Sequence, residues 1–202
     1  MERKNSAQVL EELVALMRDY SSVYRGSYLP SRTTQIEAEP GANILRESVA
    51  EHVGLLPITA SYLHPHLESQ VDLGKALTML SIHDIGETVV GDVLTVKHEK
   101  TDGHKDDEYN AALAQLHPSF HDLFREFDAN DTNEAKYAYS IDKITPNIYE
   151  LIIDKQIARA RHEHFGFSIH DAVAKDVDLM AWDPFLERLY GELIEQIRNK
   201  FS

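Results

Sequence analysis

One stretch of the chain concentrates residues that could bind a metal ion and move protons. Residues 81–92 read SIHDIGETVVGD and follow a run of apolar residues at helical spacing. A helix therefore places His83 and Asp84 side by side where it leaves the hydrophobic interior, and burying such groups costs free energy unless something pairs with them. Imidazole nitrogen and carboxylate oxygen together suit a divalent cation, so both residues are candidate ligands that need partners elsewhere in the chain.

Two more carboxylates follow in the same stretch. If the helix continues, Glu87 lies on the same face as His83 and Asp84, where it would stand beside a metal without binding it. Gly91 is a poor helix residue and a candidate terminus, at which the chain can turn and bring Asp92 back toward the same space. The alternative is a helix end with solvated charges, which is the better interpretation of an isolated His-Asp pair but not of the whole group.

The composition is that of a folded domain. The chain has 202 residues, enough for a real hydrophobic core, and we expect residues 1–202 to form a single domain. It is 43% hydrophobic and 27% charged, without an apolar run long enough to span a bilayer. A net charge of −14 argues against binding long nucleic acid but allows a small nucleotide. Because cysteine and a signal-peptide pattern are both absent, we expect a cytoplasmic protein without disulfides or thiolate sites.

Hydrophobic periodicity predicts helices nearly throughout. We therefore expect an all-α fold, a single helical bundle of about seven to nine helices. The first helix is amphipathic over roughly residues 9–20, and a long loop over 21–43 follows. In that loop Arg25 or Arg32 could reach a phosphate or lie in water, and from position alone we expect each to be solvated. No segment alternates between apolar and polar residues as a strand would.

The helix after the loop has a readable start. Ser48 and Glu51 form a candidate capping box, which places His52 in the first turn of a core helix. Pro57 should kink that helix or shift its start. Taken alone, a histidine in this position is more often a packing residue than a ligand.

A later predicted helix carries Asp142 beside its apolar stripe. Thr132 can cap this helix, and Pro146 should interrupt it. Taken alone, Asp142 would be a helix-surface carboxylate paired with Lys143 or Lys136. Three more helical segments are predicted toward the end of the chain: 148–161, 168–174 and 184–200.

The order of these residues resembles a known superfamily. A histidine, a histidine-aspartate pair and an aspartate on successive helices resemble the HD-domain metal-dependent phosphohydrolases. More narrowly, RESVAEH at 46–52 and HDIGETVVGD at 83–92 resemble the HD-domain 5′-deoxynucleotidases. The matched core spans residues 46–145.

The resemblance implies a ligand set and roles for the residues around it. It implies one divalent metal ion (Mn, Co, Zn, Ni or Mg) held by four residues, His52, His83, Asp84 and Asp142. It also implies that Glu87 positions the attacking water and that Asp92 protonates the leaving oxygen. For the substrate phosphate it points to Arg46 in the first motif, Arg32 in the preceding loop and Thr95 after the second motif.

The sequence departs from the deoxynucleotidases ahead of the first motif. Those enzymes carry an arginine followed by a tryptophan there, near the phosphate and sugar. Here Arg32 is followed by Thr33, and the only tryptophan is Trp182. The resemblance therefore supports the hydrolytic chemistry of these enzymes for this chain more strongly than it supports their preference for deoxy sugars.

These features predict a metal-dependent phosphohydrolase that removes the 5′-phosphate from a (deoxy)nucleoside monophosphate. One alternative is an HD enzyme that releases triphosphate or pyrophosphate from a nucleotide such as dATP or a guanosine alarmone. Another is a catalytically silent regulator that binds a nucleotide, but Glu87 and Asp92 argue against it because binding alone needs no proton carrier. Dimers are the commonest soluble assembly and the resemblance favours one, so we expect a homodimer.

Overall fold

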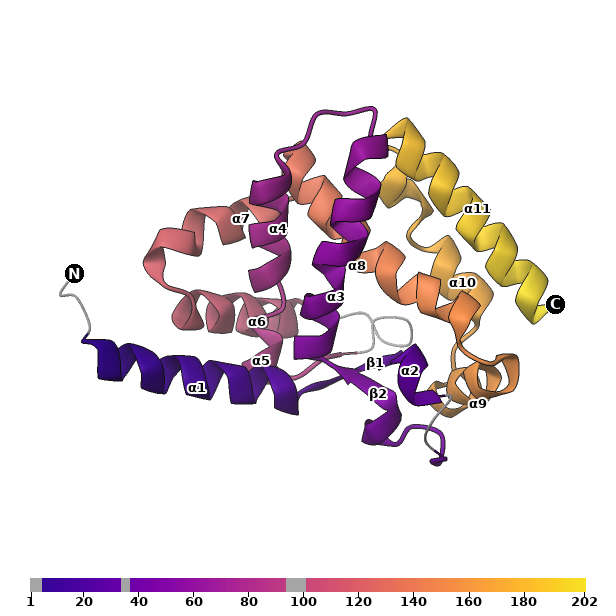
Figure 1. Cartoon of the computed structure of the whole chain (residues 1–202), viewed down its shortest axis with the longest axis horizontal. Coiled ribbons are helices and arrows are strands. Elements are labelled where there is room, and N and C mark those ends of the chain that lie inside the picture. Colours follow the sequence, from indigo (N-terminus) through magenta and orange to yellow (C-terminus); the bar gives the residue numbers. More distant parts are fainter. Residues whose placement is uncertain (1–4, 34–36, 94–100) are drawn as a thin grey trace.

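The computed structural model describes residues 5–33, 37–93 and 101–202, apart from the side chains of Asp102 and Asp171. The predicted phosphate contact Thr95 lies outside these residues. The fold is all-α apart from one small sheet, as the periodicity predicted (Figure 1). The elements in chain order are α1 Ser6–Ser22, β1 Tyr24–Tyr28, α2 Pro30–Thr33, β2 Arg46–Ser48, α3 Val49–Leu63, α4 Leu73–Ile82, α5 Glu87–Val90, α6 Asp102–Gln115, α7 His121–Ala129, α8 Asn133–Ile152, α9 Lys155–Phe165, α10 Ile169–Ala174 and α11 Pro184–Phe201.

The centre of the molecule is formed by α3, α4 and α8, which pack against one another (Figure 1). Each supplies fully buried apolar side chains to the same core, among them Leu56, Leu80 and Ile141. Fully burying an aliphatic side chain stabilises the fold by about 2 kcal/mol. This core fixes the relative positions of the three helices that carry the predicted metal ligands.

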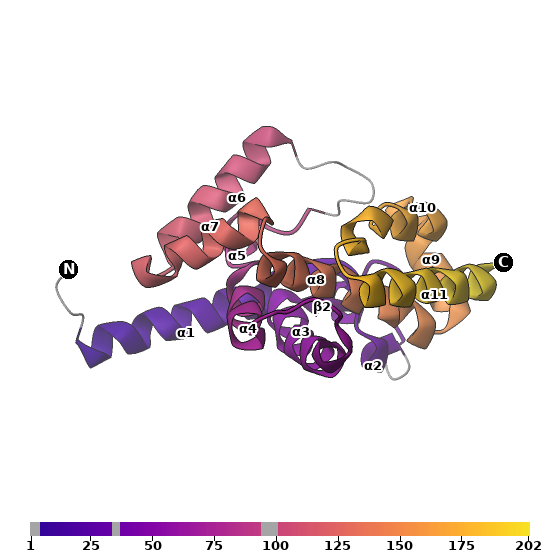
Figure 2. The same ribbon diagram turned by 90° about the horizontal axis from the view of Figure 1, so that it is seen from above.

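Two groups of helices lie on either side of these three. Figure 2 shows α6 and α7 at one end of the molecule and α9 to α11 at the other. A small apolar cluster of Ile85, Ala112, Leu116 and Phe124 joins α6 and α7 to the segment between α4 and α5. Within the described ranges, no helix is both long and apolar enough to cross a membrane.

The expectation of a strand-free loop over residues 21–43 is wrong in its first part. Strand β1 pairs antiparallel with β2, with Tyr24 opposite Ser48 and Tyr28 opposite Arg46. The register is irregular between these pairs, as in a β-bulge, which re-aims the side chains that it carries. The pairing joins residues about twenty positions apart, so no local alternation in the sequence reveals it.

Both prolines predicted to disturb helices lie inside continuous ones. Helix α3 runs through Pro57, and α8 runs through Pro146. A proline in a helix interior costs about 3 kcal/mol. The apolar core of α8 outweighs that cost, because six of its hydrophobic residues are buried. Tertiary packing thus overrides local propensity in the two helices that present His52 and Asp142.

Candidate metal centre

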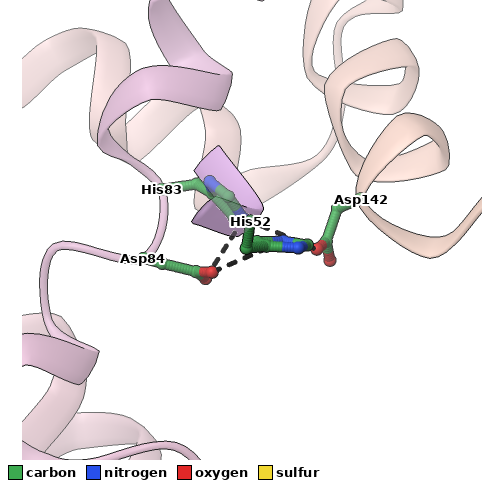
Figure 3. A group of neighbouring side chains, drawn as sticks. All are labelled: His52, His83, Asp84 and Asp142. Carbon is green, nitrogen blue, oxygen red and sulfur yellow. Dashed lines mark hydrogen bonds and ion pairs between the residues drawn. The ribbon is translucent and has the colours of Figure 1, made fainter. Parts of the chain in front are cut away.

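The four predicted metal ligands converge at the centre of the bundle (Figure 3). Each offers one nitrogen or oxygen atom, and these atoms all lie within 4.8 Å of one another. All four side chains are buried, and the part of the chain that the structure describes holds no second group of this kind. The ligands are His52 from α3, His83 and Asp84 from the turn after α4, and Asp142 from α8.

The start of α3 determines where His52 points. The predicted capping box is confirmed: Glu51 N donates to Ser48 Oγ at 3.3 Å, and Ser48 N donates to Glu51 Oε2 at 2.8 Å. These bonds satisfy two backbone donors that a helix start otherwise leaves unpaired. His52 therefore leaves the first turn in a fixed direction, with its Nε2 atom 2.9 Å from Asp142 Oδ1 and 3.6 Å from Asp84 Oδ2.

His83 and Asp84 lie in a turn and not on a continuing helix. Helix α4 ends at Ile82, and α5 begins only at Glu87. The turn requires a glycine at position 86, because a Cβ atom there would collide with the backbone oxygen of Glu108 on α6. The predicted shared helical face is thus replaced by a tight turn, which still brings Glu87 to the site.

The two imidazole rings are oriented for metal binding. His83 Nδ1 lies 3.0 Å from the Leu80 carbonyl oxygen, and His52 Nδ1 lies 3.1 Å from Glu47 Oε1. Because a carbonyl and a carboxylate only accept hydrogen bonds, both Nδ1 atoms carry the proton and both Nε2 atoms face the centre. His83 Nε2 is buried 3.1 Å from Asp84 Oδ1 and 3.5 Å from Asp142 Oδ1, but in the described residues it makes no hydrogen bond of good geometry. A buried ring nitrogen that faces two carboxylates in this way fits a cation-binding site.

The electrostatics of the site favour positive charge at its centre. Burial lowers the pKa of His83, but the Asp84 and Asp142 carboxylates outweigh burial and raise the pKa to about 10. Burial raises the pKa of the Asp84 carboxyl, but the charges of Arg25 and His83 hold it well below its usual range. Both carboxylates are therefore ionised, and a proton or a divalent ion between these groups is strongly favoured.

Arg25 lies in the site and not in solvent, so the expectation for this residue is wrong. Its guanidinium forms an ion pair with Asp84, and Nη1 also donates to Glu87 Oε2 at 3.1 Å. The side chain is only 14% exposed. The irregular register of β1 directs it inward, which the sequence could not indicate because the strand pairing is non-local.

Lys143 supplies a second cation from α8. Its Nζ atom lies 2.7 Å from Asp142 Oδ2 and 4.9 Å from the centroid of the Tyr139 ring. The predicted pairing of Asp142 with Lys143 is therefore present, but Asp142 is buried and not on the surface. Arg25 and Lys143 thus approach the two carboxylate ligands from different elements.

Glu47 is a residue of the site that sequence reasoning missed. It is fully buried, and Oε1 accepts hydrogen bonds from Ser27 Oγ at 2.6 Å and from His52 Nδ1 at 3.1 Å. A carboxylate behind a ligating histidine holds the ring in place and makes it a better electron donor. The only signal was its place in the matched motif RESVAEH, because a glutamate ahead of a helix cap is ordinarily exposed.

The candidate proton carriers line the same cavity as the ligands. The cavity has a volume of about 640 Å³, and Glu87 and Asp92 both border it beside Arg25. Gly91 ends α5 with φ 83°, a conformation that glycine adopts without strain, and the chain turns there as predicted. Asp92 Oδ2 then accepts a hydrogen bond of 3.1 Å from Gly26 N on β1.

The other predicted phosphate contacts lie outside the cavity. Arg46 Nη2 donates to the Tyr24 carbonyl oxygen at 2.7 Å, and its Nε atom donates to the Arg25 carbonyl oxygen. Arg32 donates to the Arg46 carbonyl oxygen at 2.7 Å and pairs with Glu51. Neither guanidinium borders the cavity that contains the ligands. Both instead tie β1, β2 and the start of α3 together.

Comparison with protein families identifies the fold. A family model described as an HD domain matches residues 33–179. The chain belongs to the HD-domain family. The match includes all four converging ligands of this HD domain, as well as Glu87 and Asp92.

Solved structures agree on the fold. The HD domain aligns with a predicted metal-dependent phosphohydrolase from Magnetospirillum magnetotacticum at 20% identity and a TM-score of 0.75, covering 96% of this chain and 95% of the other. A conserved hypothetical protein from Pyrococcus furiosus aligns at 20% identity with a TM-score of 0.59, covering 94% and 99%. A Pyrococcus horikoshii protein aligns at 18% identity with a TM-score of 0.60, covering 93% and 99%. A search of curated proteins found no match.

Because Glu47 orients His52, substituting it should weaken metal binding by this HD domain. In the Glu47→Gln variant, His52 Nδ1 donates its hydrogen bond to a neutral amide oxygen in place of a carboxylate. We expect metal affinity to fall about 10- to 100-fold. Titration calorimetry with Mn²⁺ and Co²⁺ measures the change. Glu39→Gln, an exposed glutamate ahead of β2, is the matched control and should bind as the wild type does. Equal affinities in the two variants would contradict the orienting role.

Proposed function

We propose that this HD domain is a metal-dependent phosphohydrolase that removes the 5′-phosphate from (deoxy)nucleoside monophosphates. The observation that carries the proposal is the convergence of two imidazoles and two carboxylates on one point, with Glu87 and Asp92 bordering the same cavity. The Magnetospirillum relative, described as a predicted metal-dependent phosphohydrolase, is consistent with this reaction class.

The ligand set is suited to a divalent cation. Two neutral imidazoles and two carboxylates, from His52, His83, Asp84 and Asp142, balance its double charge. When bound, the ion would lower the pKa of a coordinated water and polarise a phosphate oxygen. A mixed nitrogen and oxygen set does not select among Mn, Co, Zn, Ni and Mg.

The chain's own residues supply orientation and proton transfer. Glu87, held by Arg25 Nη1 at 3.1 Å, is placed to accept a hydrogen bond from the attacking water and take up its proton. Asp92, held by Gly26 N, is the candidate donor of a proton to the leaving 5′-oxygen. Arg25 is the candidate donor to the phosphate oxygens, on which negative charge develops in the transition state. We assign Arg25 this role in place of Arg46.

The size and lining of the cavity support a nucleotide substrate. A volume of about 640 Å³ exceeds what a phosphate and a sugar need. Phe127 and Tyr139 border the cavity with ring centroids 6.2 Å apart, and Phe127 also contacts the His83 ring. Aromatic rings in such a position offer surfaces on which a base can stack.

One observation favours a second reaction at the same site. Lys105, Lys143 and Lys175 also border the cavity. Three lysines in addition to Arg25 could balance a longer phosphate chain, as in an HD enzyme that releases pyrophosphate or triphosphate from a nucleotide. The product of the reaction distinguishes the two proposals.

A screen of substrates and metals tests both. Purified protein is incubated with nucleoside and deoxynucleoside mono- and triphosphates in the presence of Mn²⁺, Co²⁺, Zn²⁺, Ni²⁺ or Mg²⁺. Ion chromatography then separates phosphate, pyrophosphate and triphosphate. We expect inorganic phosphate and a nucleoside from monophosphates. Release of only pyrophosphate or triphosphate would replace the first proposal with the second, and no product with any metal would overturn both.

A further inference from the structure

Helix α1 exposes an unusual amount of apolar surface. None of its 17 residues is buried, although its sequence is amphipathic. Five large apolar side chains are 44–62% exposed: Val9, Leu10, Leu13, Val14 and Met17. A contiguous apolar patch of this kind on a folded protein is typical of an interaction site, because leaving it in water costs free energy.

The C-terminal end of α1 is attached to the body, while the exposed stripe extends along the rest of the helix. Leu16 and Tyr20 pack against the apolar cluster around Ile85, and Tyr20 Oη donates to the Ser81 carbonyl oxygen at 3.4 Å. Figures 1 and 2 both show α1 running outward, with its N-terminal end far from the C-terminus of the chain. Because its C-terminal end is fixed to the body, α1 keeps its orientation, and its exposed apolar residues remain accessible to a partner.

We propose that α1 pairs in antiparallel fashion with α1 of a second copy of this chain. The five exposed apolar residues recur at spacings of three and four, which places them on one side of the helix. When two such helices cross between Leu13 and Val14, Leu10 of one copy lies opposite the partner's Met17, and Leu13 lies opposite the partner's Val14. The stripe is therefore complementary to itself about a two-fold axis, as a symmetric dimer requires.

The charges beside the stripe fit the same arrangement. Glu11 and Arg18 are exposed and lie seven positions apart, on the same flank of the helix. In the antiparallel pair, Arg18 of each copy comes close to the partner's Glu11, which gives two equivalent ion pairs. In a parallel pair this flank would face the opposite flank of the partner helix, so neither ion pair would form.

The composition of α1 argues against a membrane as the occupant. Helices that bind membrane surfaces carry a polar face rich in lysine and arginine. Here the polar positions include Glu11, Glu12 and Asp19, with Arg18 as the only cation of the helix. The net charge of the chain, −14, adds repulsion from anionic lipids. A second copy removes the same apolar surface from water and also brings each Arg18 close to the partner's Glu11.

Mass measurements in solution test the proposal. Sedimentation equilibrium over micromolar concentrations should give twice the chain mass of 23.0 kDa. Leu10→Glu and Leu13→Glu should each raise the dissociation constant of the dimer at least about tenfold, because each places a charge within the apolar contact. Ile58→Glu is the matched control: this residue in the C-terminal half of α3 is 65% exposed and is not part of the stripe, so the dimer should persist. Circular dichroism verifies that each variant is folded.

Charge reversal tests the antiparallel register independently. Glu11→Arg and Arg18→Glu should each weaken the homodimer, because each brings like charges together. An equimolar mixture of the two variants should dimerise as well as the wild type, since each mixed pair restores opposite charges at both contacts. The proposal is overturned if the wild-type protein is monomeric at these concentrations, if mixing fails to restore the dimer, or if α1 instead binds vesicles of phosphatidylserine and phosphatidylcholine in a pelleting assay.

Discussion

Replacing Asp84 by alanine is expected to abolish metal binding and to lower phosphohydrolase activity by roughly three orders of magnitude or more. Asp84 provides one of only two carboxylates in the ligand set, and its loss leaves an incomplete shell with a single negative charge. His83→Ala should have the same effect, because it removes the buried ring nitrogen that faces both carboxylate ligands. Plasma emission spectroscopy measures bound metal, and the phosphate-release assay measures turnover.

Thermal unfolding separates loss of the ion from loss of the fold. Adding metal should raise the Tm of the wild-type protein, since a ligand that binds only the native state stabilises it, and chelation with EDTA should reverse the shift. The Tm of His83→Ala and Asp84→Ala should not respond to metal. Asp122→Ala, which changes a 99% exposed aspartate on α7, is the matched control. Full turnover with wild-type metal content in a folded Asp84→Ala variant would refute the proposed centre.

Replacing Arg25 by methionine is expected to lower kcat/KM about 100- to 1,000-fold while bound metal is largely retained. The long apolar side chain fills the same space, but Glu87 loses its partner at 3.1 Å and the phosphate loses a charged donor. Steady-state kinetics with a nucleoside monophosphate measure the change. A fall in kcat larger than the rise in KM would indicate that the interaction is stronger in the transition state than with bound substrate.

Arg46→Met distinguishes the two arginines. Its guanidinium donates to backbone carbonyl oxygens on β1, so this variant should lose thermal stability more than catalytic rate. Arg125→Met on the surface of α7 should change neither property, because its side chain is 50% exposed. If Arg46→Met stays folded but inactive while Arg25→Met retains its rate, the phosphate contact would belong to Arg46 as the sequence motif suggests.

The sequence indicated those parts of the site that depend on neighbouring residues. His83 and Asp84 are adjacent, and the cap that places His52 is a pattern of four residues, so both could be recognised locally. Asp142 was less evident from its own surroundings, because an aspartate followed by a lysine is common on helix surfaces. Only the order of all four ligands along the chain gave it significance, and the structure brings the four together.

The parts that could not be predicted depend on contacts between distant segments. Arg25 enters the site because β1 pairs with residues about twenty positions later, and its own neighbours give no sign of that pairing. Glu47 is buried for the same reason. Pro146 was expected to end a helix, because local propensity does not include the buried residues on both sides of it. Tertiary packing decides each of these cases.

The two cations that pair with Asp84 and Asp142 also affect the order of folding and metal loading. Arg25 and Lys143 supply internal counterions for the acidic ligands, so we expect the polypeptide to fold before it binds a metal ion. Zinc fingers, by contrast, fold only with their metal. An ion entering this preformed site would displace two tethered charges toward the cavity, where an incoming phosphate dianion would meet them. Metal loading would in this way prepare the protein for its substrate.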